Sequence, residues 1–191
     1  MESTEKLNVT IYTESSPNPN SMKFVVNFML MPDGASVDFD SPINAASSPL
    51  ALDLFRYNFV KRVFISSNFI TITKVDEADW TDVSHLLKPF IKAYLEDKNP
   101  ILTEFKESDI NDDDPEIVKK IKSLLDEYVR PAVESDGGAI SFASFENGIV
   151  TVKLQGSCSG CPSSTMTLKA GIENLMKRMI PEVVEVVAEN A

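Results

Sequence analysis

Short apolar runs separated by polar turn residues dominate the first half of the chain. Runs rich in β-branched and aromatic residues predict strands, and the Ser, Pro, Asn and Gly between them predict turns. The tripeptide Ser66-Ser67-Asn68 predicts a hairpin between two of these runs. The runs are Leu7–Thr13, Lys23–Leu30, Ala35–Asp40 (after an Asp33-Gly34 turn), Val60–Ile65 and Phe69–Val75.

Two segments of this half have the spacing of helices. Ser48–Tyr57 predicts a short helix with Pro49 in its first turn, where the missing N–H is not needed. Asp79–Leu95 predicts a longer helix, because its apolar residues recur every three or four positions. Its apolar stripe consists of Trp80, Val83, Leu87, Phe90, Ile91 and Tyr94.

A stretch without apolar periodicity separates the two halves. Acidic residues crowd it and no strand or helix pattern survives, so residues 98–114 are predicted to be an acidic linker. At its end, Asp114 followed by Pro115 and Glu116 predicts a helix N-cap. The alternative for Asp112-Asp113-Asp114 is a divalent-ion site.

The second half opens with a predicted helix and a hairpin. Pro115–Val129 has helical spacing, and Pro131 is expected to end the helix. The turn Asp136-Gly137-Gly138 leads into two runs joined by Glu146-Asn147-Gly148, a strong hairpin signal. The helix has its predicted stripe at Ile117, Ile121, Leu124, Leu125 and Tyr128, and the hairpin strands are Ala139–Phe145 and Ile149–Leu154.

A cysteine loop, a helix and a strand complete this half. The helix is predicted over Pro162–Met179, Pro181 ends it, and Val183–Ala188 is a last strand. The sequence therefore predicts the α+β class, with two small α+β domains joined by an acidic linker. Their predicted bounds are 1–97, 98–114 and 115–191.

Charge and hydropathy exclude two classes of function. A formal net charge of −11 is unfavourable for binding nucleic acid, which needs clustered Lys and Arg. No apolar run reaches the roughly 18 residues that span a bilayer. Met1 to Asn8 is polar and has neither an apolar core nor an Arg-rich amphipathic pattern, which predicts a bacterial cytoplasmic protein. A processed organellar form is the alternative.

The cysteines point to one chemical site. The chain has two, Cys158 and Cys161, with Ser159-Gly160 between them. In a reducing compartment such a pair is typical of metal binding or redox chemistry. Pro162 suits the first helical position, so Cys161 is expected beside a helix N-terminus. The N–H groups and positive dipole end there favour thiolate over thiol. The glycines are expected to leave the loop uncluttered and exposed.

Three interpretations of the loop remain open. The cysteines are small structural residues, a dithiol oxidoreductase pair, or metal ligands. Two features are evidence against the redox interpretation. A redox dithiol of this kind opens a βαβ unit with a parallel sheet, whereas a hairpin precedes this loop, and no aromatic residue adjoins Cys158. Metal ligation includes zinc in an interaction module as well as an iron–sulfur cluster.

Counting ligands favours a site shared by two chains. Zinc and iron–sulfur clusters both need about four donors, whereas one chain supplies two thiolates. His85 lies on a predicted helix in the other half and is expected to be an ordinary histidine. A two-fold homodimer would supply four cysteines by symmetry, with an apo monomer in the absence of metal, and a small thiol from solution is the alternative source of the missing donors. A site between exposed loops would be labile, which suits delivery.

The residues around the cysteines closely resemble the C-terminal NifU-like domain of Nfu-type iron–sulfur proteins. The resemblance covers nearly all of Pro115–Ala191. Ala139 departs from it, because the family often has Asp after the two glycines. It rests on Asp136-Gly137-Gly138, Gly148-Ile149-Val150, Thr167-Leu168-Lys169, Gly171-Ile172-Glu173 and the string from Leu154 to Ser164, Leu-Gln-Gly-Ser-Cys-Ser-Gly-Cys-Pro-Ser-Ser.

The first half is similar to the N-terminal domain of many Nfu proteins. The likeness rests on Ser16–Phe24, Ser48-Pro49-Leu50-Ala51, Val63-Phe64-Ile65 and Phe69–Lys74. The resemblance implies contact with targets or partners for this domain.

The resemblance implies a function in iron–sulfur cluster assembly. It implies a [4Fe–4S] cluster, with [2Fe–2S] the alternative, bound by Cys158 and Cys161 of two subunits and transferred to apo-proteins. An upstream assembly scaffold is the expected source. The resulting hypothesis is a non-enzymatic carrier, and a thiol–disulfide oxidoreductase or a zinc-binding interaction module are the alternatives.

Overall fold

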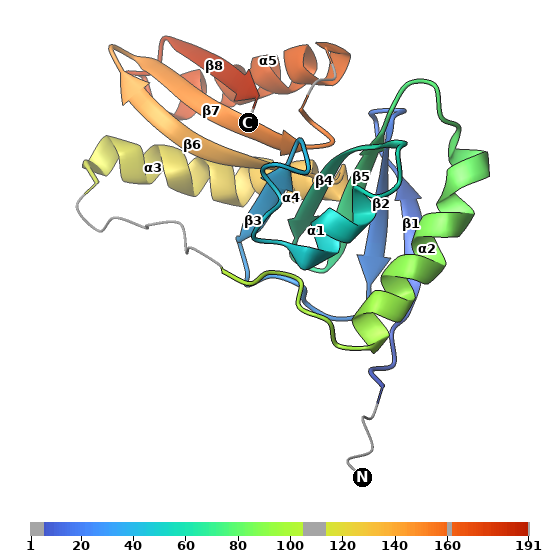
Figure 1. Cartoon of the computed structure of the whole chain (residues 1–191). Coiled ribbons are helices and arrows are strands. Elements are labelled where there is room, and N and C mark those ends of the chain that lie inside the picture. Colours follow the sequence, from blue (N-terminus) through green and yellow to red (C-terminus); the bar gives the residue numbers. More distant parts are fainter. Residues whose placement is uncertain (1–5, 105–113, 160–161, 191) are drawn as a thin grey trace. The chain divides into compact units, whose positions relative to one another are not determined.

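The computed structural model describes residues 6–104, 114–159 and 162–190, with the backbone alone for residues 162–164 and 190. The chain divides into one unit of residues 1–15 and 19–107 and another of residues 16–18 and 108–191. Each unit has its own sheet (Figure 1). Each also has its own hydrophobic core. The predicted α+β class with two domains is confirmed. The predicted bounds stay predictions, and residues 105–113 of the predicted linker lie outside the described residues.

An antiparallel five-stranded sheet forms the frame of the first unit. Its strand order is β1-β2-β5-β4-β3. The β1–β2 hairpin forms one edge, the β4–β5 hairpin lies beside β2, and β3 pairs with β4 at the other edge. The predicted hairpin at Ser66-Ser67-Asn68 is present, and Ser67 takes a positive φ of 42° at its tip. The strands are β1 (Ile11–Ser15), β2 (Ser21–Val26), β3 (Ser36–Phe39), β4 (Val60–Ser66) and β5 (Phe69–Lys74).

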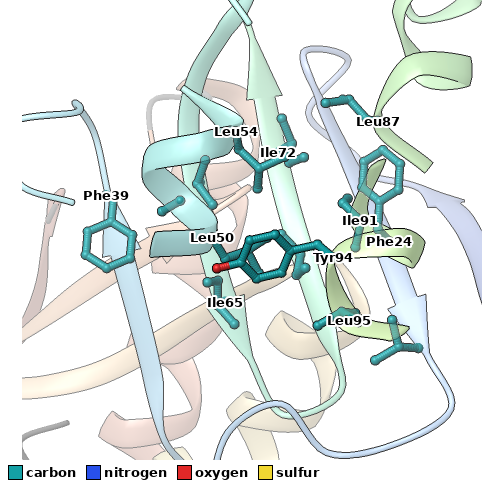
Figure 2. Packing of buried hydrophobic residues seen from close by; sticks show 14 of the residues in the cluster. Phe24, Phe39, Leu50, Leu54, Ile65, Ile72, Leu87, Ile91, Tyr94 and Leu95 are labelled. Atoms are coloured by element: carbon teal, nitrogen blue, oxygen red, sulfur yellow. The ribbon is translucent and has the colours of Figure 1, made fainter. Parts of the chain in front are cut away.

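Two helices bury their apolar sides in one core with this sheet (Figure 2). α1 (Pro49–Leu54) starts where the sequence predicts, because the Ser48 hydroxyl accepts the Ala51 N–H at 3.1 Å as its N-cap. α2 (Trp80–Glu96) is capped by Asp79 and buries Leu87 and Ile91 completely. The alternation of β2 and β5 turns Phe24, Val26, Ile70 and Ile72 toward these helices.

The residues that follow α2 extend the core of the first unit. Ile101 and Leu102, which belong to the predicted linker, pack against this core. The Ser48 hydroxyl donates to the Ile101 carbonyl at 2.7 Å, and the Tyr94 hydroxyl donates to the Pro100 carbonyl at 2.8 Å. Two apolar residues are too few to show a period, so the sequence pattern gives no sign of this packing.

The second unit is built on a three-stranded sheet of mixed direction. β6 (Gly138–Glu146) and β7 (Ile149–Gly156) form the predicted antiparallel hairpin. Asn147 and Gly148 at its turn both have positive φ, 52° and 82°, as an Asn-Gly hairpin turn requires. β8 (Glu185–Asn190) pairs with β7 in parallel and completes the order β6-β7-β8.

The first helical region of this unit does not end at Pro131, and the prediction that it does is wrong. α3 (Glu116–Leu124) passes into a π-helical turn (Leu125–Val129), and α4 (Arg130–Ser135) follows without a break. Pro131 therefore stands in the first turn of α4. The missing proline N–H is tolerated there, because a helix start leaves its first N–H groups without intrahelical partners.

The π-turn also changes which residues face the core. It adds a residue to the turn, so Val129 and Val133 are buried and Tyr128, a predicted stripe residue, is 54% exposed. The predicted N-cap is likewise wrong. Pro115 occupies the cap position without a side-chain bond, and the Asp114 carboxylate instead pairs with the Lys122 ammonium.

α5 (Pro162–Met179) keeps its predicted bounds and completes the core of the second unit. None of the helices within the described residues has the length and apolarity needed to cross a membrane. Alternate residues of the sheet face the helices: Ile140, Val150, Val152, Leu154 and Val186, with Ile121, Leu124, Leu125, Ile172 and Met176 from α3, the π-turn and α5.

Glu173 ties α5 to the last strand. One carboxylate oxygen accepts from the Lys177 ammonium at 2.6 Å, and the other accepts from the Val186 backbone N–H at 3.1 Å. The Lys177 bond lowers the pKa of Glu173 most, and the Val186 bond adds to this shift. The ionised carboxylate therefore stabilises the folded state.

We expect this link to make folding sensitive to acid. A carboxyl with a lowered pKa stabilises the fold above its unfolded value of about 4.3, and the contribution is lost as pH falls through the lower folded value. NMR titration should place the pKa of Glu173 below that ordinary value. In Lys177→Ala it should move upward. An unchanged Glu173 titration in Lys177→Ala would contradict this assignment.

Candidate metal centre

The cysteine loop follows β7 and leads directly into α5. Gly156 ends the strand with a φ of 66°, a conformation that glycine adopts without strain. The three described residues that follow are all buried: Ser157 is 3%, Cys158 6% and Ser159 7% exposed. The loop therefore turns into the second unit instead of standing out from it.

Ser157 fastens the loop to the turn that precedes β6. Its hydroxyl donates to the Asp136 carbonyl at 2.6 Å, and its backbone N–H donates to the Gly137 carbonyl at 3.2 Å. Gly137 has a φ of 83°, which turns the chain back toward β7. The predicted Asp136-Gly137-Gly138 turn thus serves as the base of the cysteine loop.

Ser159 and Thr165 hold the other side of Cys158. The Ser159 hydroxyl donates to the Leu154 carbonyl at 3.2 Å, and its N–H donates to the Gly156 carbonyl at 3.1 Å. The Thr165 hydroxyl, from the first turns of α5, donates to the Cys158 carbonyl at 3.3 Å. The Thr165 hydroxyl thus bonds to the backbone of Cys158 itself, and the two serine hydroxyls bond its neighbours to the Asp136 and Leu154 carbonyls.

The Cys158 side chain is buried and belongs to the core of the second unit. The expectation of an exposed loop is therefore wrong at this residue. The physical reason is that the two neighbouring serines pair their own polar groups with carbonyls of the β6–β7 framework. Their hydroxyls donate to Asp136 and Leu154, and their N–H groups donate to Gly137 and Gly156, so Ser157 and Ser159 can be buried beside Cys158. The signal in the sequence is the Ser-Cys-Ser order, because hydroxyl residues beside a buried loop residue are typical partners of backbone groups.

Cys161 and Gly160 lie outside the described residues. α5 begins at Pro162, so the predicted proline at the first helical position is confirmed. The assignment of both cysteines as ligands stays a prediction. Among the described residues, no group of three or more His, Cys, Asp and Glu side chains comes together to hold a metal ion.

His85 and the acidic run do not contribute a described ligand group. His85 is exposed on α2 in the first unit. Asp112 and Asp113 lie outside the described residues, and Asp114 is paired with Lys122.

The cysteine loop does open a βαβ unit, so the prediction that it does not is wrong. β7, α5 and β8 form such a unit, because β8 pairs with β7 in parallel from Ile149 with Glu185 onward. The β6–β7 hairpin precedes it. A strand-to-helix junction is also where dithiol oxidoreductases carry their cysteines, so the order of elements does not exclude redox chemistry. Pairing between β7 and β8 is non-local, and the hairpin alone gave no sign of it.

Comparison with known proteins decides the family. Residues 11–98 match the family described as "Scaffold protein Nfu/NifU N terminal", and residues 121–187 match the "NifU-like domain". A human protein named "NFU1 iron-sulfur cluster scaffold homolog, mitochondrial" is 46% identical over 180 residues, which are 91% of this chain and 69% of that protein. The chain belongs to the Nfu family. The resemblance inferred from the sequence is confirmed.

Other Nfu relatives give a similar picture. A Drosophila persimilis protein with the same printed name is 45% identical over 185 residues, 93% of this chain and 64% of that protein. The chain thus spans a little under two thirds of this relative's length. A solution NMR structure of a NifU-like protein from Saccharomyces cerevisiae matches at 25% identity and a TM-score of 0.45, covering 55% of this chain and 92% of that chain.

The predicted bacterial cytoplasmic location is wrong for this Nfu chain. The human and Drosophila relatives are both named as mitochondrial proteins. The prediction rested on the polar character of residues 1–8, a property that proteins of either compartment can have.

We expect Ser157→Ala to loosen the cysteine loop. It removes the hydroxyl that donates to the Asp136 carbonyl, and a lost hydrogen bond of this kind lowers the free energy of unfolding by about 1 kcal/mol. Urea unfolding of the apo protein measures the change. Ser141→Ala, at an exposed position of β6, is the matched control and should have little effect. Equal unfolding midpoints for the two variants would show that the hydroxyl does not hold the loop.

Proposed function

We propose that this chain is a non-enzymatic iron–sulfur cluster carrier. It binds a cluster through Cys158 and Cys161 and passes it to apo iron–sulfur proteins. The observation that carries the proposal is the held position of Cys158, fixed through Ser157, Ser159 and Thr165 at the start of α5 in a member of the Nfu family. The helix start supports it, because N-terminal N–H groups and the helix dipole stabilise an anionic metal–thiolate complex.

The burial of Cys158 favours a carrier over a thiol–disulfide oxidoreductase. In thiol–disulfide exchange a sulfur of the dithiol must reach a sulfur of the partner. Reactive cysteines therefore lie in partly exposed sites. Cys158 is 6% exposed and packs in the core. A thiol in this position is poorly placed to react with a disulfide of another protein.

Ligand number supports a site made by two chains. A [4Fe–4S] cluster needs four ligands, and two copies of Cys158 and Cys161 supply them in a two-fold homodimer. The [2Fe–2S] form is the alternative cluster type.

The printed names of the relatives support the cellular setting. They describe mitochondrial iron–sulfur cluster scaffolds, and we infer the same compartment and role for this chain. The cluster would come from an upstream assembly scaffold and leave to recipient apo-proteins. Two separate chains that each hold half of the ligands release the cluster more readily than one chain with all four.

We expect anaerobic incubation with iron and sulfide to load the protein. The loaded protein should show the broad visible absorption of thiolate-bound clusters, and Mössbauer spectroscopy identifies the [4Fe–4S] or [2Fe–2S] form. Cys158→Ala and Cys161→Ala should each lose the cluster. Cys158→Ala should also lower the free energy of unfolding by about 1 kcal/mol, because it removes a buried sulfur from the core.

His85→Ala is the matched control for this experiment, because it removes the chain's one histidine and leaves both thiols. It should load as the wild type does. A full cluster in Cys158→Ala would contradict the ligand assignment. A colourless protein that reduces disulfides with turnover would favour the oxidoreductase, and tight binding of zinc without iron uptake would favour an interaction module.

Cluster loading should also change the oligomeric state. Native mass spectrometry should find monomer without cluster and a dimer with one cluster per two chains, because each chain supplies half of the ligands. Mixing wild type with Cys158→Ala/Cys161→Ala chains should give no mixed dimer with a cluster. A loaded monomer would contradict the shared site, and cluster transfer to an apo-enzyme from the loaded dimer would complete the test of the carrier role.

A further inference from the structure

Gly138, the first residue of β6, faces the thiol of Cys158. A Cβ atom built on Gly138 would lie 2.8 Å from the Cys158 Sγ atom and 3.4 Å from its Cβ atom. Non-bonded carbon atoms prefer separations of about 3.5–4.0 Å, and sulfur is larger than carbon. Any side chain at position 138 would therefore occupy space that the Cys158 sulfur fills.

The backbone of Gly138 does not explain why glycine stands there. Gly34, Gly137, Gly148 and Gly156 have positive φ, whereas Gly138 lies in a strand outside that region. An alanine could adopt its backbone conformation without strain. Glycine is required at this position for a steric reason. A Cβ atom would be too close to the Cys158 sulfur and to the Gln155 carbonyl oxygen, each 2.8 Å from the built Cβ.

The pairing of β6 with β7 explains why the Cys158 sulfur lies beside Gly138. Gly138 is directly opposite Gly156, so neither strand has a side chain at the point where the cysteine loop begins. The loop folds back over this gap, and Ser157 fixes it to the turn before β6. The backbone of Gly138 is then the surface on which the Cys158 sulfur rests.

We propose that Gly138 is a positioning residue for Cys158. It determines where the sulfur lies by leaving a space that only a glycine provides, and through Cys158 it sets the geometry of the cluster ligand. The steric part concerns the apo protein alone. The part that concerns ligand geometry rests on the proposed carrier function.

A double-mutant cycle tests the steric part without any cluster. Gly138→Ala is introduced into the wild type and into Cys158→Ala, and chemical unfolding measures all four proteins. In the wild type the new methyl group meets the sulfur, so the unfolding constant should rise about tenfold or more. In Cys158→Ala the methyl group enters the vacated space, so the rise should be several-fold smaller.

Two glycines provide matched controls. Gly148→Ala, in the hairpin turn at the other end of β7, should destabilise the protein equally with and without Cys158. The reasons are its φ of 82° and a built Cβ 2.8 Å from Val184 and 2.9 Å from the Glu182 carbonyl. Gly171→Ala, where a Cβ meets nothing within 4 Å, should not destabilise it.

Each outcome of the unfolding cycle either supports or overturns the proposal. A smaller effect of Gly138→Ala in the Cys158→Ala background supports the proposal, and so does a double variant that folds when Gly138→Ala alone does not. An equal effect in both backgrounds overturns it, as does failure of both variants to fold. The Gln155 carbonyl alone would then account for the glycine.

Cluster loading tests the part that rests on the carrier function. Under conditions where both variants are folded by circular dichroism, Gly138→Ala should bind less cluster per chain or show an altered cluster spectrum. Gly148→Ala should bind normally. Equal loading and equal spectra would overturn this part. A wild type that takes up no cluster would refute the carrier function and leave the result of the unfolding cycle unaffected.

Discussion

The burial of the cysteine loop is the constraint on which the arrangement of the second unit depends. Ser157, Cys158 and Ser159 lie inside the unit, so the polar backbone around them needs partners other than water. The serine hydroxyls provide them by donating to the Asp136 and Leu154 carbonyls, and Thr165 donates to the Cys158 carbonyl. Without these hydroxyl groups, burying the loop would leave unpaired polar groups at about 1–3 kcal/mol each. The Ser-Cys-Ser sequence is therefore as much a structural feature as a chemical one.

The parallel pairing of β7 and β8 places this loop where α/β units commonly bind ligands. In a βαβ unit the crossover helix starts at the carboxyl end of the first strand, and its positive dipole end faces whatever the connecting loop holds. α5 is such a helix, and it begins directly after the second cysteine. This geometry suits a metal–thiolate complex and a redox dithiol alike. The exposure of the Cys158 side chain distinguishes the two functions. A thiol that is 6% exposed is accessible to a disulfide only after the loop moves.

Local sequence signals predicted the elements well, and non-local packing accounts for the errors. The Asn147-Gly148 hairpin and the start of α5 at Pro162 depend on a few adjacent residues, and both are as predicted. The prediction that Pro131 ends the helix failed because a π-turn precedes the proline and places it in the first turn of a new helix. The parallel position of β8 and the burial of Cys158 depend on residues far apart in the chain, so no local pattern could reveal them. Gly138 is the clearest case, since its need for glycine appears only when the sulfur is placed beside it.

The burial of Cys158 and its proposed use as a ligand are energetically compatible. Moving one small apolar group out of a core costs about 1 kcal/mol, of the order of one buried methylene group. For comparison, structural zinc binding in zinc-finger peptides contributes about 10–16 kcal/mol, an order of magnitude more. Ligation could therefore offset the cost of opening the loop around the sulfur while the sulfur keeps its place beside Gly138. The smaller term would still act in the empty form, because it keeps the thiol in the core and away from solvent. A carrier that alternates between loaded and empty states benefits from both, since its empty form keeps this thiol out of reach of oxidants.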